Sequence, residues 1–154
     1  MDFHLSFPIK SFESKLNYKQ KLLFVGSCFA ENMGELMQQS KFDAVLNPNG
    51  ILYNPQSILT AIQRYMSNEK YLEKDLFYAN ECWNSWEHHS RYSNPNKEIC
   101  LAELNEQLNV AHHQLKQADW LFITFGSSFI YKHVETNQLV GNCHKVPQQQ
   151  FEKL

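Results

Sequence analysis

One stretch near the amino terminus, residues 21–32, constrains the fold of this chain more than any other. It contains an apolar run at 22–25 that lacks alternation, which is typical of a parallel strand buried on both faces. Gly26 breaks the run, and Ser27 then stands at a strand-to-helix turn, where unpaired helix amides can stabilise an oxyanion. The serine can act as a nucleophile or simply cap the helix, and this stretch alone favours the cap.

Strands and helices alternate along the rest of the chain. A second strand is predicted at 42–46, and an apolar run predicts another buried strand at 120–125. Apolar residues at helical spacing predict a helix that begins at Pro55 and another over 101–118, and a hairpin is expected within 129–140. The alternation is typical of an α/β fold, here a three-layer α/β/α sandwich with a parallel sheet.

Periodicity also predicts which side chains of the helices face the core. The helix after Ser27 is expected to bury its large apolar residues, namely Phe29, Met33, Leu36 and Met37. Cys28 could be a thiolate nucleophile at the helix start, but a cysteine there commonly points into the core as a small hydrophobe, which is the preferred interpretation. His112 and His113 fall off the apolar stripe of the later helix and are expected in solvent.

Length and composition describe one ordered domain. The chain has 154 residues, 43% of them hydrophobic, enough for a real core but not for a second full domain. From 70 to 97 the periodicity fails, so this segment is interpreted as an insertion within a single domain that spans 1–154. Trp83 and Trp86 are expected to anchor the insertion rather than to stack on a sugar. The polar residues 1–20 predict a leading arm.

Charge and cysteine content exclude several classes of protein. A net charge of -2 offers no basic excess for binding nucleic acid. No stretch approaches the length of a membrane span and the amino terminus lacks a secretory signal, so a cytoplasmic location is expected. Four widely spaced cysteines are expected as reduced thiols. The cysteine and histidine spacings form no paired zinc ligands, so neither a metal nor another cofactor is expected.

Five short segments, met in this order along the chain, carry a resemblance to a known family. They are 26–30 (GSCFA), 47–55 (NPNGILYNP), 86–90 (WEHHS), 124–128 (TFGSS) and 142–147 (NCHKVP). On these segments the chain resembles the GSCFA family over most of its length. That family is similar to the SGNH hydrolases, so the resemblance implies a flavodoxin-like sheet with Ser27 as the nucleophile.

The resemblance also implies a set of residues around Ser27. In SGNH enzymes the oxyanion hole combines the serine amide, a glycine after the second strand and an asparagine after a later strand, and Gly50 matches the glycine. Ser128 stands where the asparagine would be, and Asn142 lies a short way downstream. The other residues expected to line the site are Asn49, Gly126, His89 and His144. His144 and Asn142 can bind a substrate group or orient water, or they can merely satisfy loop backbone groups.

The chain departs from the SGNH pattern at the catalytic base. SGNH enzymes use an Asp-x-x-His segment, and no aspartate of this chain is followed by such a histidine. The base is therefore expected beyond Leu154, together with the last strand and helix, which leaves an apolar sheet edge that favours oligomerisation. The leading hypothesis is a serine hydrolase or acyltransferase acting on an ester, such as an O-acyl group on a carbohydrate. The alternatives are a binding module that keeps the cleft without the chemistry, and a thiol enzyme that uses Cys28.

Overall fold

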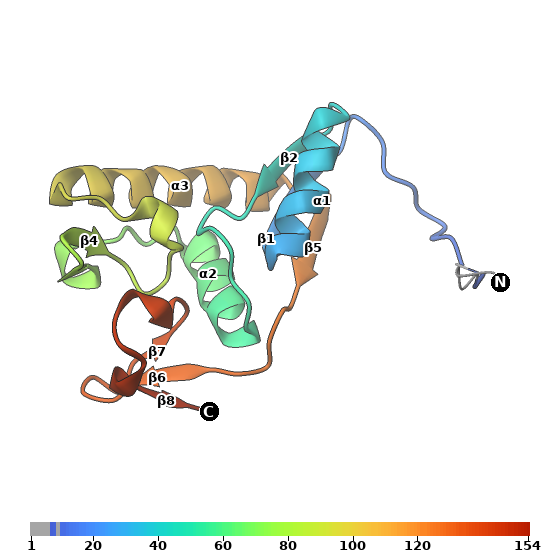
Figure 1. The fold of residues 1–154 in the computed structure, drawn as a ribbon. Helices are drawn as coiled ribbons and strands as arrows, with labels where there is room; N and C mark the ends of the chain where they lie inside the picture. The colour runs from blue at the N-terminus through green and yellow to red at the C-terminus, as the bar shows by residue number, and fades with distance from the viewer. Residues whose placement is uncertain (1–6, 9) are drawn as a thin grey trace.

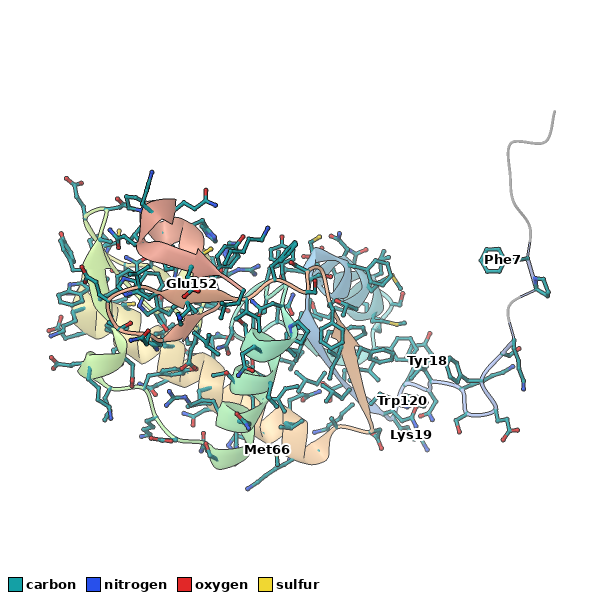
Figure 2. All side chains as sticks on the ribbon, turned by 90° about the horizontal axis from the view of Figure 1, so that it is seen from below. Phe7, Tyr18, Lys19, Met66, Trp120 and Glu152 are labelled. Carbon is teal, nitrogen blue, oxygen red and sulfur yellow. The ribbon has the colours of Figure 1, made fainter. Side chains whose placement is uncertain are left out.

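The computed structural model of the chain describes residues 7–8 and 10–154. Its helices are α1 (Cys28–Gln39), α2 (Pro55–Ser67) and α3 (Lys97–Gln117), and its strands are β1 (Lys21–Gly26), β2 (Asp43–Leu46), β3 (Phe77–Ala79), β4 (Cys82–Asn84), β5 (Trp120–Thr124), β6 (Tyr131–His133), β7 (Leu139–Val140) and β8 (Phe151–Lys153) (Figure 1). Short 3-10 helices lie between them, namely η1 (Glu73–Asp75), η2 (Ser90–Tyr92), η3 (Cys143–Lys145) and η4 (Gln148–Gln150). Residues 1–6 and 9 of the predicted arm lie outside the described residues, and Phe7 stands apart from the other side chains in Figure 2.

The central sheet joins segments that lie far apart in the sequence. Its strand order is β2-β1-β5, and both strand pairs are parallel. In this register Leu23 lies between Val45 and Leu121. Parallel neighbours need a crossover, which α1 supplies between β1 and β2. The arrangement confirms the predicted α/β fold with a parallel sheet, whereas a complete three-layer sandwich stays a prediction.

Alternate residues of β1 point to the two faces of this sheet. Leu22 and Phe24 pack with Ala30 of α1 on one face. Leu23 and Val25 pack on the other face within the cluster that α2 and α3 contribute to. In Figure 1, α1 accordingly lies on one side of the sheet, and α2 and α3 lie on the other. This burial on both faces explains why the run has no polar alternation.

Strand β5 is less buried than its apolar sequence predicts. Leu121 and Ile123 are each 40% exposed, although they align with buried residues of β1. The reason is position, because β5 forms one edge of the sheet and no strand in the described part of the chain pairs with its outer side. The expectation of a fully buried strand at 120–125 is therefore wrong. Oligomerisation through this edge stays a prediction.

Helix α1 buries part of the face that its large apolar residues predict. Met33 and Met37 pack against the core cluster as expected, whereas Leu36 is 54% exposed and the expectation for it is wrong. Ala30 and Gly34 are its buried residues, and a Cβ atom at Gly34 would overlap the side chain of Leu46. Because the helix approaches the strands closely at Gly34, a small residue is needed at that point, and Phe29, which was expected in the core, is 61% exposed. Cys28 is exposed too, so the prediction that it points into the core is wrong.

Asparagine caps set the starts of the two longer helices. The side chain of Asn54 caps α2 directly before Pro55, which confirms the helix expected there. Asn96 caps α3, so this helix begins at Lys97, one turn before the predicted start at 101. The apolar spacing marked the face of the helix that packs, whereas the cap decides where the helix begins.

Helix α3 buries a histidine that was expected in solvent. His112 is buried, and its Nδ1 donates a hydrogen bond to the backbone carbonyl of Tyr65 at 2.7 Å. This bond satisfies the imidazole within the contact between α2 and α3. The expectation for His112 is therefore wrong, while His113 beside it is exposed as expected.

Smaller β elements lie on the side of α2 opposite the parallel sheet (Figure 1). β3 and β4 pair as an antiparallel hairpin within 70–97, and β7-β6-β8 form an antiparallel sheet. The pairing of β6 with β7 confirms the hairpin expected within 129–140. The interpretation of 70–97 as an insertion stays a prediction. Every helix among the described residues is too short or too polar to cross a membrane.

Candidate active site

Ser27 forms the turn between β1 and α1. Its backbone is extended, with φ −71° and ψ 176°, and its Oγ accepts a hydrogen bond from the Phe29 amide at 3.3 Å. Only 6% of the residue is exposed. The serine thus stands at the carboxyl edge of the sheet and caps the helix at the same time.

The closest partner of the Ser27 hydroxyl is Thr124, the last residue of β5. The two hydroxyl oxygens are 2.8 Å apart. The Ser27 amide points at both the carbonyl oxygen and the hydroxyl oxygen of Thr124, each at 3.1 Å. Sequence reasoning missed Thr124 as a site residue. Two signals were available, because Thr124 opens the segment 124–128 and stands at the end of a predicted strand, which places it at this edge of the sheet.

Gly26 makes the close approach of Thr124 possible. Its φ is +140°, a conformation that residues with side chains rarely adopt. A Cβ atom at this position would overlap the carbonyl oxygen of Thr124 and crowd its hydroxyl. The glycine before the serine is therefore required by the geometry of the turn.

A buried asparagine anchors the turn from the loop after β2. Asn47 accepts a hydrogen bond from the Gly26 amide at 2.8 Å, and its Nδ2 donates to Glu31 at 3.0 Å. Glu31 also pairs with Arg91 at 2.6 Å. Burial raises the pKa of Glu31, but the hydrogen bonds from Asn47 and Arg91 outweigh it, so the pKa is lowered overall. Sequence reasoning missed these three residues, and only Asn47 carried a signal, as the start of the turn segment 47–50.

The two predicted site residues of this loop are engaged within the protein. Gly50 donates its amide to the carbonyl of Asn47 at 2.6 Å, and a Cβ atom at this glycine, with its φ of +76°, would overlap His89. The side chain of Asn49 is buried and accepts a hydrogen bond from the hydroxyl of Tyr65 at 2.8 Å. Asn49 therefore fastens the loop to α2, and Gly50 brings the loop against His89.

Of the two predicted residues after β5, Gly126 lies beside Ser27. A Cβ atom at Gly126 would stand 3.4 Å from the Cβ of Ser27 and 2.5 Å from the ring of Tyr53. The missing side chain thus allows the ring of Tyr53 to pack closely against Gly126, next to Ser27. Ser128 is exposed, and within the described part of the chain it makes no hydrogen bond to Ser27.

The predicted histidines lie beside each other rather than against Ser27. The ring centroids of His89 and His144 are 6.4 Å apart. Burial, together with neighbouring positive charge, lowers the pKa of both imidazoles. Asn142 is buried, and its Nδ2 finds no hydrogen-bond partner among the described residues. The structure therefore brings Gly126 to Ser27, but it places these three predicted residues outside the contacts of the serine hydroxyl.

No acid or base contacts the serine hydroxyl in residues 7–8 and 10–154. The partners of Ser27 Oγ are the hydroxyl of Thr124 and the amide of Phe29. Nor do any three His, Cys, Asp or Glu side chains of those residues gather as ligands for a metal ion. The four cysteines are free thiols. Chemically, the site presents a hydroxyl held by neutral groups at a helix start.

A comparison with known protein families identifies the chain. Its sequence matches the GSCFA family over residues 21–154. The chain belongs to the GSCFA family. No curated protein and no solved structure matches it. The match begins at the first residue of β1 and covers all five segments on which the family was expected, so that prediction is confirmed.

This GSCFA chain also buries a cationic side chain near the two histidines. Lys145 Nζ donates to the carbonyl of Ser85 at 2.6 Å and to that of His88 at 2.8 Å. Burial lowers the pKa of Lys145 to about 8. His88 is buried as well, and the loss of hydration holds its pKa well below the ordinary value. The contacts of Lys145 fasten η3, which carries His144, to the segment that carries His89.

Proposed function

We propose that this chain carries the nucleophile of an SGNH-like serine hydrolase or acyltransferase, in which Ser27 attacks an ester. The observation that carries the proposal is the place of the Ser27 hydroxyl, at the carboxyl edge of a parallel sheet and at the start of α1. Helix amides at such a position favour developing negative charge. Helices on both faces of the sheet support a further proposal, that the fold is a three-layer sandwich of the SGNH type.

The proposed reaction passes through an acyl-enzyme. A base takes the proton of Ser27 while Oγ bonds to the ester carbonyl carbon, and the alcohol leaves with that proton as the carbon–oxygen bond of the ester breaks. Water, or in a transferase a second alcohol, then takes the acyl group and restores the serine. The proposed oxyanion donors are the amides of Ser27 and Gly50, with Ser128 or Asn142 as a third donor.

The proposal sets two requirements on the site. The amide of Ser27 donates to Thr124 and that of Gly50 donates to Asn47, so a bound substrate must draw at least one of them toward its oxyanion. Such bonds often become well aligned only in the substrate complex. The reaction also needs a base at Ser27 beyond the present partners of its hydroxyl.

Exposed aromatic side chains near Ser27 support an O-acyl carbohydrate as the substrate class. Phe29 follows the serine by two residues and is exposed. Tyr53, also exposed, packs against Gly126, which lies beside Ser27. Aromatic surfaces of this kind bind acyl chains and the apolar faces of sugar rings.

Replacement of the nucleophile tests the proposal. We expect Ser27→Ala in the full-length protein to lower the hydrolysis of a short acyl ester, such as p-nitrophenyl acetate, by about 10³-fold or more. Loss of the helix cap costs about 1 kcal/mol, so the variant stays folded by circular dichroism. Ser67→Ala, which removes an exposed hydroxyl on α2, is the matched control. Unchanged turnover in Ser27→Ala contradicts the proposal.

A non-catalytic binding module is the second candidate. It is favoured by the occupied amides of Ser27 and Gly50 and by the fact that, among the described residues, no acid or base bonds to the serine hydroxyl. Such a module binds an acylated oligosaccharide without cleaving it. Calorimetry measures the affinity of the wild-type protein and of Ser27→Ala for this ligand. Equal affinities, with no acid released from the ligand over hours, support this candidate over the hydrolase.

A further inference from the structure

We infer that Thr124 is a positioning residue for the Ser27 nucleophile, with its hydroxyl donating to Ser27 Oγ. This inference rests on the proposed function. Thr124 ends β5, and in the parallel register it lies opposite Gly26, directly before the serine. The two hydroxyls therefore meet at one edge of the sheet although they are 97 residues apart in the sequence.

The contacts between Thr124 and Ser27 fix both the backbone and the side chain of the serine. The Ser27 amide is held by the carbonyl and by the hydroxyl oxygen of Thr124, each at 3.1 Å. The hydroxyl oxygens are 2.8 Å apart, the ordinary length of an O–H···O bond. A threonine has a stiff χ1, which suits it to hold a second hydroxyl in one place.

The direction of the hydroxyl bond decides whether Ser27 can react. Either oxygen can donate at this distance. If Ser27 donates, its proton is bound to Thr124 and is turned away from a base. If Thr124 donates, Ser27 Oγ accepts from Thr124 and from the Phe29 amide, and its own proton remains available for removal. Only the second arrangement serves a nucleophile, and its two donors also stabilise the alkoxide that forms.

Gly26 is the second independent sign that this contact is built into the turn. A Cβ atom there would overlap the carbonyl oxygen of Thr124 and crowd its hydroxyl. The glycine thus allows the end of β5 to approach the serine as closely as it does. Thr124 at the end of β5 and the Gly26–Ser27 turn at the end of β1 therefore form one packed arrangement.

The experiment compares the rate at which a fluorophosphonate labels Ser27, mapped by mass spectrometry, across a range of pH. The variants in the full-length protein are Thr124→Val, which keeps the shape without the hydroxyl, and Thr124→Ser, which keeps the hydroxyl. Thr60→Val removes a threonine hydroxyl that donates to the Gln56 carbonyl within α2, and it is the matched control. Circular dichroism checks that each variant folds. If Thr124→Val does not fold, Thr124→Ala is used in its place.

We expect Thr124→Val to label about tenfold more slowly, the effect of one lost hydrogen bond to a developing charge, and to need a higher pH for its half-maximal rate. Thr124→Ser should recover most of the rate, and Thr60→Val should match the wild type. A folded Thr124→Val that labels at the wild-type rate, with an unchanged pH profile, overturns the inference and leaves the proposed function standing. Absence of Ser27 labelling in the wild-type protein overturns the proposed function, and the inference with it.

Discussion

The turn at Ser27 and the cluster around Lys145 hold their polar groups in opposite ways. At the Ser27 turn, formed by Gly26, Ser27 and Thr124, the partners are neutral hydroxyl and backbone groups. In the Lys145 cluster, formed by Ser85, His88 and Lys145, titratable side chains are buried and their pKa values are shifted by the loss of hydration.

This difference shows that His88 and Lys145, the buried groups of the cluster with shifted pKa values, are not hydrogen-bond partners of the candidate nucleophile. Perturbed groups commonly mark active sites, but buried structural networks perturb the pKa equally well. Lys145 donates to two backbone carbonyls that belong to one loop, which is a structural task. The Ser27 turn is instead shaped by backbone geometry. The following predictions test this contrast between a turn shaped by close backbone packing and a cluster stabilised by a buried charged side chain.

The largest effect is expected where close backbone packing shapes the turn. Gly26→Ala places a methyl group against backbone atoms of Thr124, at a φ of +140°, and should lower the free energy of unfolding by about 3 kcal/mol. Gly126→Ala is the control, because its new methyl meets mainly the movable side chain of Tyr53 and should cost less. Urea unfolding measures both, and equal losses would show that the Gly26 turn is not uniquely constrained.

A smaller effect is expected where buried charge holds the loop. Lys145→Ala leaves the carbonyls of Ser85 and His88 without their donor and should lower the free energy of unfolding by about 2 kcal/mol. Lys116→Ala, on the exposed side of α3, should change it by less than about 0.5 kcal/mol. Chemical unfolding at neutral pH compares the two, and the structural role of Lys145 fails if both variants match the wild type.

The smallest effect is expected in the pH dependence of the free energy of unfolding. The folded pKa of His88 lies well below 6.5, so below that pH the unfolded chain binds a proton that the folded chain does not. The contribution of His88 to stability is therefore present above pH 6.5 and is lost as the pH falls, by at most about 1.4 kcal/mol per pH unit. His88→Gln should flatten this decline in urea titrations between about pH 7 and about pH 5.

A matched variant separates His88 from the other histidines. His113 is exposed on α3, so His113→Gln should keep the wild-type decline with pH. If the free energy of unfolding of His88→Gln falls with pH as steeply as that of the wild type, the pH dependence arises from other groups. Burial of His88 then does not determine the pH dependence of stability.

Local signals were enough to predict the elements that position Ser27. The unalternating run before Gly26 predicted a doubly buried strand, and the serine after it predicted both a helix start and a place at the sheet edge. Pro55 marked the start of α2 in the same way. These predictions succeeded because strand formation, turns and caps depend on residues close together in the chain.

Contacts between distant elements escaped the same reasoning. Periodicity placed Phe29 in the core, but α1 turns its Ala30 and Gly34 face toward the sheet and leaves Phe29 exposed. It placed His112 in solvent, where the neighbouring α2 in fact supplies an acceptor. Apolar composition implied that β5 is buried, but only the strand order shows that it forms an edge.

By itself, the sequence determined the strand, the glycine turn, the capping serine and the family, since each of these is written in short local patterns. Only the tertiary structure decided which groups meet the serine. It placed Thr124 against Ser27 and left His89 and His144 beside each other. The physical reason is that a hydrogen bond across 97 residues depends on strand order and register, which arise from packing of the whole sheet and not from any local stretch of residues.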